Sequence, residues 1–215
     1  MRGNGHDFAR PGLTDLIEPE QAEAAAEVLG QAAGEQAVST LLRLIGEDPE
    51  RDGLQRTPAR VVKAWREMTS GYQEDPHEIL KTTFEVHYDQ MVVLDSIPFV
   101  SLCEHHVLPF TGVARVGYVP SKDGHVVGIS KLARLVECFA RRLQVQERLT
   151  QQVANAVHEI LKARGTGVVI RAAHECMSCR GVKKHASMVT SCLRGDMRTD
   201  GSMRAEFLAL PNIGA

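Results

Sequence analysis

The chain has 215 residues, of which 43% are hydrophobic and 24% charged, and its 25 basic and 27 acidic side chains give a formal net charge of −2. These proportions suit a globular domain with a substantial core, and the near-neutral charge argues against nucleic acid or a membrane surface as its partner. The N-terminus lacks the apolar segment of a signal peptide, and no run approaches the roughly 20 apolar residues that span a bilayer. We therefore expect a cytoplasmic protein.

The first part of the chain predicts helices. Residues 1–18 are rich in Gly, Pro and charge, which favours a mobile segment. The tract EPEQAEAAAEVLGQAAG has strong helix formers with Gly30 and Gly34 as possible stops, and EQAVSTLLRLIGED and RTPARVVKAWREM follow with apolar residues at helical spacing. We expect an N-terminal extension over 1–34, partly mobile and partly helical, and a main domain over 35–215.

The rest of the chain alternates between strand and helix patterns. TTFEVHYDQMVVLDS, FTGVARVGYVP, GVVIRAAHECM and ASMVTSCLRG are typical of strands, whereas GISKLARLVECFARRL and VQERLTQQVANAVHEILKARG are typical of helices with one apolar face. The order β-β-α-α-β-β joins like elements by short connections. This order predicts an α+β fold, in which an antiparallel four-stranded sheet carries two antiparallel helices on one face. Ser130 is the expected N-cap of the first of these helices.

Residues that can bind a metal gather in two short stretches. SLCEHHVLPF contains Cys103 and His106 in a C-x-x-H arrangement, which presents both side chains on one side of a turn. HECMSCRGVKKH follows after a long gap, and a strand over 168–176 would place His174 and Cys176 on one face. The five cysteines of a cytoplasmic chain are expected to be reduced. Thiolate and imidazole together favour zinc.

The same residues allow other interpretations. A closed structural zinc site would add Cys179 as a fourth ligand and leave His105 and His174 without a role, whereas a catalytic site keeps one position for water. Unrelated buried cysteines and stray histidines are a second alternative. A nucleobase deaminase needs H-x-E ahead of a separate P-C-x-x-C. Here Glu175 directly follows the histidine and no proline precedes Cys176.

Basic residues flank these stretches. Lys131 and Arg134 stand near the start of a predicted helix, and Arg180 follows the second cysteine stretch. Helix N-termini with adjacent Lys and Arg favour phosphate, although a solvated basic face is the alternative. A metal with an activated water beside an anion site suggests hydrolysis of a phosphorylated small molecule. Glu147, at the next helix start, either complements the helix dipole or accepts hydrogen bonds from a purine.

The stretches SLCEHH, GISKLAR, QVQERLTQQ, HECMSCRGVKK and TSCLRG, in this order, resemble GTP cyclohydrolase I over roughly residues 35 to 210. The resemblance implies the tunnelling fold (T-fold) and a toroidal homodecamer with active sites at subunit contacts. It implies hydrolysis of GTP to formate and 7,8-dihydroneopterin triphosphate, in which zinc-activated water attacks guanine C8, as the first step of pterin and folate biosynthesis. The alternative is a zinc-stabilised nucleotide-binding or structural oligomeric protein without catalysis.

The resemblance also implies a role for each site residue. The zinc ligands are expected to be Cys103, His106 and Cys176. The expected catalytic residues are His174 as the acid/base group, His105 and Ser130. The residues expected to bind guanine are Gln146 and Glu147. The residues expected at the ribose and triphosphate are Ser130, Lys131, Arg134, Arg180 and, from a neighbouring subunit, Arg60.

Overall fold

The computed structural model describes residues 19–86 and 88–210. The segment 1–18, which the sequence predicts to be mobile, lies outside the described residues. Contacts divide the chain into two compact units, with the boundary between Arg66 and Glu67. Among the helices of the described residues, none combines the length and apolar character needed to cross a membrane.

The first unit contains one long helix where the sequence predicted a break. Helix α1 spans Pro19–Leu44 and runs through both Gly30 and Gly34. A glycine inside a helix costs roughly 0.5–1 kcal/mol relative to alanine. At Gly34 close packing offsets this cost, because a Cβ there would lie 3.1 Å from Val62 Cγ2 on α2 (Thr57–Met68). The prediction that these glycines end a helix is therefore wrong.

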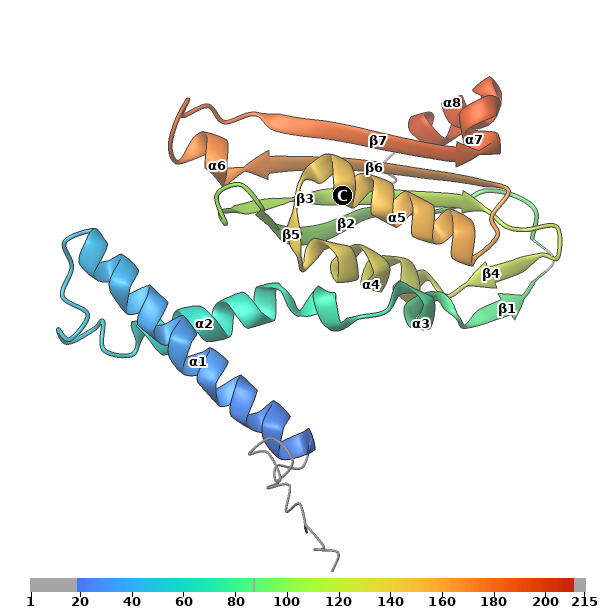
Figure 1. Ribbon diagram of the computed structural model, residues 1–215. Helices are drawn as coiled ribbons and strands as arrows, with labels where there is room; N and C mark the ends of the chain where they lie inside the picture. The colour runs from blue at the N-terminus through green and yellow to red at the C-terminus, as the bar shows by residue number, and fades with distance from the viewer. Residues whose placement is uncertain (1–18, 87, 211–215) are drawn as a thin grey trace, which may run out of the picture. The chain divides into compact units, whose positions relative to one another are not determined.

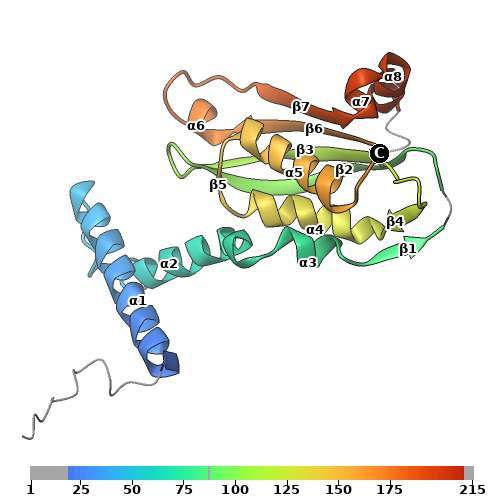
Figure 2. The same ribbon diagram turned by 45° about the vertical axis from the view of Figure 1, so that its right-hand side comes forward.

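The second unit is built around a five-stranded sheet (Figure 1). Across the sheet its strands are β5 (Leu143–Gln144), β2 (Val92–Cys103), β3 (Pro109–Val119), β6 (Gly165–His174) and β7 (Ser187–Gly195). Neighbouring strands are antiparallel, except that β5 pairs in parallel with the end of β2. One face is covered by α4 (Ile129–Ala140) and α5 (Gln146–Ile160) (Figures 1 and 2). The predicted α+β layer is confirmed, with β5 as an addition.

The segment predicted as the first strand, residues 82–96, is divided between two sheets. Thr83–Glu85 forms β1, which pairs antiparallel with β4 (His125–Val127) in a separate two-stranded sheet, and the chain enters β2 at Val92. Alternating apolar residues predicted extended backbone here, but they could not predict the change of partner. Between α2 and β1 the chain forms η2 (Ser70–Gln73) and α3 (Pro76–Leu80).

The core of the second unit lies between the sheet and the two helices. The strands contribute side chains with almost no exposed surface, and α4 and α5 contribute leucine and valine from one face each. The principal members are Phe110, Val116, Tyr118, Leu132, Leu135, Leu149, Val153, Val157 and Ile170. Gln144, Gln146 and Thr150 are also buried, each at 1% exposure, at the end of the core where α5 begins. Buried polar groups are costly unless hydrogen-bonded, so their partners matter.

The opposite face of the sheet is partly covered by the C-terminal helices α7 (Asp196–Thr199) and α8 (Gly201–Ala209). Phe207 of α8 is fully buried against Gly117 and Gly167, which pair directly across β3 and β6. Both glycines neighbour valines that face α4 and α5, so they point to the other face. The missing side chains make the notch into which Phe207 inserts.

A methyl group in this notch should destabilise the protein. In Gly167→Ala the added Cβ would meet Phe207 Cε1 at 2.6 Å, well inside contact distance. Overpacking of this kind typically costs about 1–3 kcal/mol, which is measurable as a lower denaturant midpoint. Adding Phe207→Leu should recover part of the loss by making room. An unchanged midpoint in Gly167→Ala would show that α8 does not depend on the notch.

Candidate metal centre and its surroundings

The turn between β2 and β3 positions two of the predicted ligands. Cys103 is the last residue of β2, and its N–H donates to Leu108 O at 2.8 Å. The N–H of Val107 donates in turn to Cys103 O at 2.8 Å, which closes a tight loop containing His106. Val107 has φ 55°, a left-handed conformation that is strained for a β-branched residue by roughly 1–3 kcal/mol. The loop holds this strain beside Cys103 and His106.

Cys176 reaches the same place by a route that the sequence analysis did not predict. Strand β6 ends at His174, and Cys176 lies on the short helix α6 (Glu175–Ser178), where Cys179 N–H donates to Glu175 O at 3.0 Å. The expected strand over 168–176 is therefore wrong at its end, because the chain turns helical after His174. Helix α6 and the β2–β3 turn lie at the same end of the sheet (Figures 1 and 2).

Cys103, His106 and Cys176 together form a group that can hold a metal ion. Their ligand atoms all lie within 4.8 Å of one another. Cys103 is buried, Cys176 is half-buried and His106 is exposed, so the group opens to solvent on one side. Burial and the neighbouring Cys103 thiol raise the pKa of the Cys176 thiol. Two thiolates at this spacing are unfavourable without a cation between them, so the donor set fits a bound metal ion.

His174 lies beside this group and is held from two sides. Its ring stacks on Phe110, with centroids 4.6 Å apart and planes at 5°. Its Nε2 lies 2.9 Å from Oε1 of Gln146. Burial lowers the pKa of His174 below its ordinary value, and the charge of Glu147 opposes this effect. Burial therefore favours the neutral imidazole over the imidazolium ion at this position.

A pair of charged residues joins the metal turn to the start of α5. Both terminal nitrogens of the Arg148 guanidinium, Nη1 and Nη2, contact the carboxylate of Glu104, and the Nη2–Oε1 distance is 3.0 Å. The Arg148 guanidinium holds the pKa of Glu104 below its usual range. The N–H of Glu104 also donates to Gln144 O at 3.0 Å. Sequence analysis missed this pair because its members are far apart in the chain and have no diagnostic spacing.

Four other predicted site residues differ in their exposure to solvent. His105 is exposed, with Nδ1 at 3.9 Å from Cys103 Sγ, and Glu147 is exposed in the first turn of α5. Arg180 follows α6, and its Nη1 lies 3.3 Å from His106 Nε2. Gln146, in contrast, is 1% exposed. Its burial argues against the expected direct contact of its side chain with a ligand.

The start of α4 does not converge with the metal group within one chain. The expected N-cap Ser130 lies inside the helix, whose N-cap is Gly128, and Lys131 and Arg134 follow. The C-terminal end of α4 leads into β5, which pairs with β2 at Cys103. At 1.5 Å per residue, the start of α4 is about 15 Å away along its axis. Arg60 belongs to α2 in the first unit.

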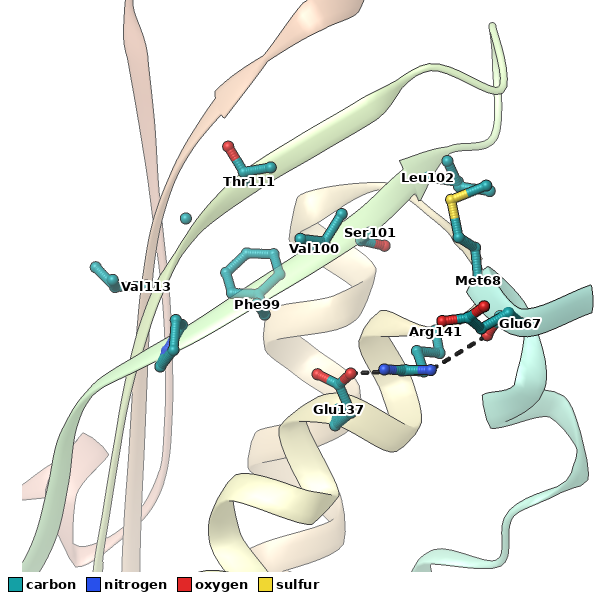
Figure 3. A pocket seen from close by; sticks show the side chains of 12 residues that line it. Glu67, Met68, Phe99, Val100, Ser101, Leu102, Thr111, Val113, Glu137 and Arg141 are labelled. Carbon is teal, nitrogen blue, oxygen red and sulfur yellow. Dashed lines mark hydrogen bonds and ion pairs between the residues drawn. The ribbon is translucent and has the colours of Figure 1, made fainter. Parts of the chain in front are cut away.

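Two hollows of different character occur in the second unit. A small one of about 210 Å³ is lined by His174, Glu175, Ser178 and residues after α6. A larger one of about 620 Å³ is lined by the edge of β2, by β3 and by α4, and it contains none of the predicted site residues (Figure 3). Arg141 on its wall pairs with Glu137 and donates to Glu67 O at 3.3 Å. The larger of these two hollows is therefore not the one that contains the predicted catalytic residue His174.

A three-ligand group open on one side, beside a histidine fixed by stacking, is typical of metal-dependent enzymes rather than of closed structural zinc sites. The chain matches the family model for GTP cyclohydrolase I over residues 34–212. It is 50% identical over 181 residues to GTP cyclohydrolase 1 of Dehalococcoides mccartyi, covering 84% of this chain and 96% of that protein. The corresponding protein of Chlorobaculum tepidum is 53% identical over 186 residues, covering 86% and 81%. That of Streptomyces avermitilis is 52% identical over 177 residues, covering 82% and 88%.

The chain therefore belongs to the GTP cyclohydrolase I family, which has the T-fold. This confirms the resemblance found in the sequence motifs.

The ligand count can be tested with two neighbouring cysteines. Cys176 is in the metal group, whereas Cys179 is exposed and outside it. We expect Cys176→Ser to fall from about one metal ion per chain to near zero and Cys179→Ser to remain at about one, as measured by elemental analysis of the purified proteins. Cys179→Ser serves as the matched control. Loss of metal from both variants would support the closed four-ligand site instead.

Proposed function

We propose that this chain hydrolyses GTP to formate and 7,8-dihydroneopterin triphosphate, the entry reaction of pterin and folate biosynthesis. Membership of the family supports the reaction, and the convergence of Cys103, His106 and Cys176 within 4.8 Å, beside His174, is the observation that carries it. The family match begins at residue 34, which supports an N-terminal extension over 1–34 ahead of the catalytic domain. We place the activity in the cytoplasm, where the thiols stay reduced.

Zinc is the metal that we propose, because two thiolates and one imidazole suit it best among common metals. Cys103, His106 and Cys176 would hold it and leave one position open. When bound, zinc would lower the pKa of a water molecule toward neutrality and so supply the nucleophile for guanine C8. The Glu104–Arg148 pair keeps the turn that carries Cys103 and His106 fixed against α5.

The chain's own acid/base and recognition groups follow from their positions. His174 would carry a proton to the ring nitrogen next to C8, and His105 would serve as a further proton carrier. Ser130, at the distant start of α4, would serve as a proton carrier in the site of a neighbouring subunit. Glu147 is exposed in the first turn of α5, close enough for its charge to affect the pKa of His174. Its carboxylate would accept hydrogen bonds from the N–H groups of guanine. Arg180, next to His106, would bind the triphosphate.

The remaining phosphate contacts would come from other copies of the chain. Lys131 and Arg134 lie about 14 Å and about 9 Å along α4 from Ala140, the end of that helix nearest the metal group, and we propose that they act across a subunit contact, as we do for Arg60. The hollow beside His174 has about 210 Å³. This is below the roughly 300–1,000 Å³ of ligand pockets. A site completed by neighbouring subunits would account for the difference.

Incubation of the purified protein with GTP tests the proposal directly. The products to follow are formate and a pterin that becomes fluorescent on oxidation. Cys176→Ser, which should lack metal, is the inactive control. Binding of GTP by the metal-loaded protein without formation of either product would favour the alternative, a zinc-stabilised nucleotide-binding protein without catalysis.

Replacement of the acid should separate metal holding from proton transfer. Because His174 is outside the metal group, His174→Ala should keep its zinc and bind GTP. Formate release should fall by roughly a hundred- to ten-thousand-fold, the usual cost of losing a general acid. Metal content and formate are measured on the same sample. A variant that has lost its zinc would make His174 a ligand and overturn the acid assignment.

We further propose a homodecamer, as the family resemblance implies. Strand β7 ends the sheet, and β5 pairs with β2 only at Leu102 and Cys103, so two edges offer pairing to another chain. Val100 on β2 and Val189 on β7 expose apolar surface at these edges, at 51% and 52%. Sedimentation at assay concentration should give a large closed oligomer. A fully active monomer would contradict both the assembly and the shared site.

A further inference from the structure

The side chain of Gln146 is enclosed by a hydrogen-bond network that fixes which way its amide points. The nitrogen Nε2 lies 3.1 Å from each of three acceptors, which are Ile170 O, Met188 O and Thr190 Oγ1. Backbone carbonyls can only accept hydrogen bonds, so the group that faces them must be the NH₂ end of the amide. An exchange of nitrogen and oxygen would place the amide oxygen against two backbone carbonyl oxygens, none of which can donate a hydrogen bond.

The two threonines next to this amide agree with that orientation. Thr150 Oγ1 donates to the backbone carbonyl of Gln146 at 2.7 Å, so its hydrogen is already used. Thr190 Oγ1 lies 2.7 Å from Thr150 Oγ1 and must therefore donate to it. This leaves Thr190 free to accept from Gln146. Each threonine hydroxyl hydrogen therefore has one place, and the two amide hydrogens of Gln146 are shared among three acceptors.

The amide oxygen of Gln146 then determines the state of the neighbouring imidazole. This oxygen lies 2.9 Å from His174 Nε2 and can only accept, so Nε2 must carry a hydrogen. In the neutral ring the lone pair is consequently on Nδ1. Stacking on Phe110 fixes the plane of the ring, and the bond to Gln146 fixes which edge of the ring faces the amide.

We propose that Gln146 is a positioning residue that holds His174 in the Nε2–H form, so that His174 exchanges protons with the substrate through Nδ1. The inference rests on the proposed function, in which His174 is the proton carrier. Nδ1 takes up a proton from solvent, and the ring then bears hydrogen on both nitrogens. The Nδ1–H bond breaks as an N–H bond forms on guanine, and the ring returns to the Nε2–H form. Gln146 accepts the same hydrogen bond throughout.

Kinetics of two matched variants test the positioning role. Gln146→Met removes the acceptor for His174 at similar size and should lower kcat by roughly 10- to 100-fold, as loss of an orienting partner does, with the KM for GTP and the zinc content unchanged. The control is Gln144→Met, since Gln144 is equally buried but bonds Phe139 O and Gln152 instead. A raised KM with normal kcat would mean that Gln146 binds guanine directly, and unchanged kinetics would also overturn the proposal.

A spectroscopic measurement on the unaltered network covers the case in which Gln146→Met fails to fold. Metal-loaded protein labelled with ¹⁵N in histidine is measured by solid-state NMR at a pH where the ring is neutral, with His174→Gln to assign the signals. We expect His174 to have hydrogen on Nε2 and none on Nδ1. Hydrogen on Nδ1 would overturn the proposal even if the enzyme makes formate. If His174 has hydrogen on Nε2 only but the protein makes no formate, the proposed function is rejected. The role of Gln146 in orienting His174 would then still stand.

Discussion

The pairing of β3 with strands on both sides is the constraint from which the rest of the site follows. Its register places Pro109 opposite Leu102 of β2 and Phe110 opposite His174 of β6. The turn that carries Cys103 and the helix that carries Cys176 therefore begin at the same end of the same strand. Because side chains alternate between faces, a shift of the β3–β6 register by one residue would turn His174 away from the core. Its contacts with Phe110 and Gln146 would then be lost.

Buried polar groups at this end of the core fix the orientation of the side chains around the site. Apolar packing alone tolerates small rearrangements, whereas a buried amide with every partner assigned permits one orientation. Gln146 is such a group, and it joins α5 to β6 and β7 through Ile170 O and Met188 O. The exposed pair of Glu104 and Arg148 contributes less to stability, since surface ion pairs are weak. Its effect is to keep the metal turn beside α5.

Local patterns predicted what depends on local chemistry. Apolar periodicity predicted α4, α5 and the four long strands of the second unit, and the C-x-x-H spacing identified Cys103 and His106. Two of the errors depend on residues distant in sequence. Gly34 does not stop a helix because Val62 packs against it, and Gln146, polar and at a helix start, is buried because two strands supply acceptors. No spacing in the sequence encodes the stacking of Phe110 on His174.

The long separation between the two halves of the metal group has a kinetic consequence for the newly made chain. Cys103 and His106 are synthesised well before Cys176, and they meet it only after β3 and β6 have paired across α4 and α5. Pairing between such distant segments is slow, because loop closure must precede the contacts that reward it. We therefore expect metal capture to follow the pairing of the strands rather than to start it. During this interval the thiols are accessible and unprotected, so a chain that folds slowly is exposed to oxidation at the residues it needs last.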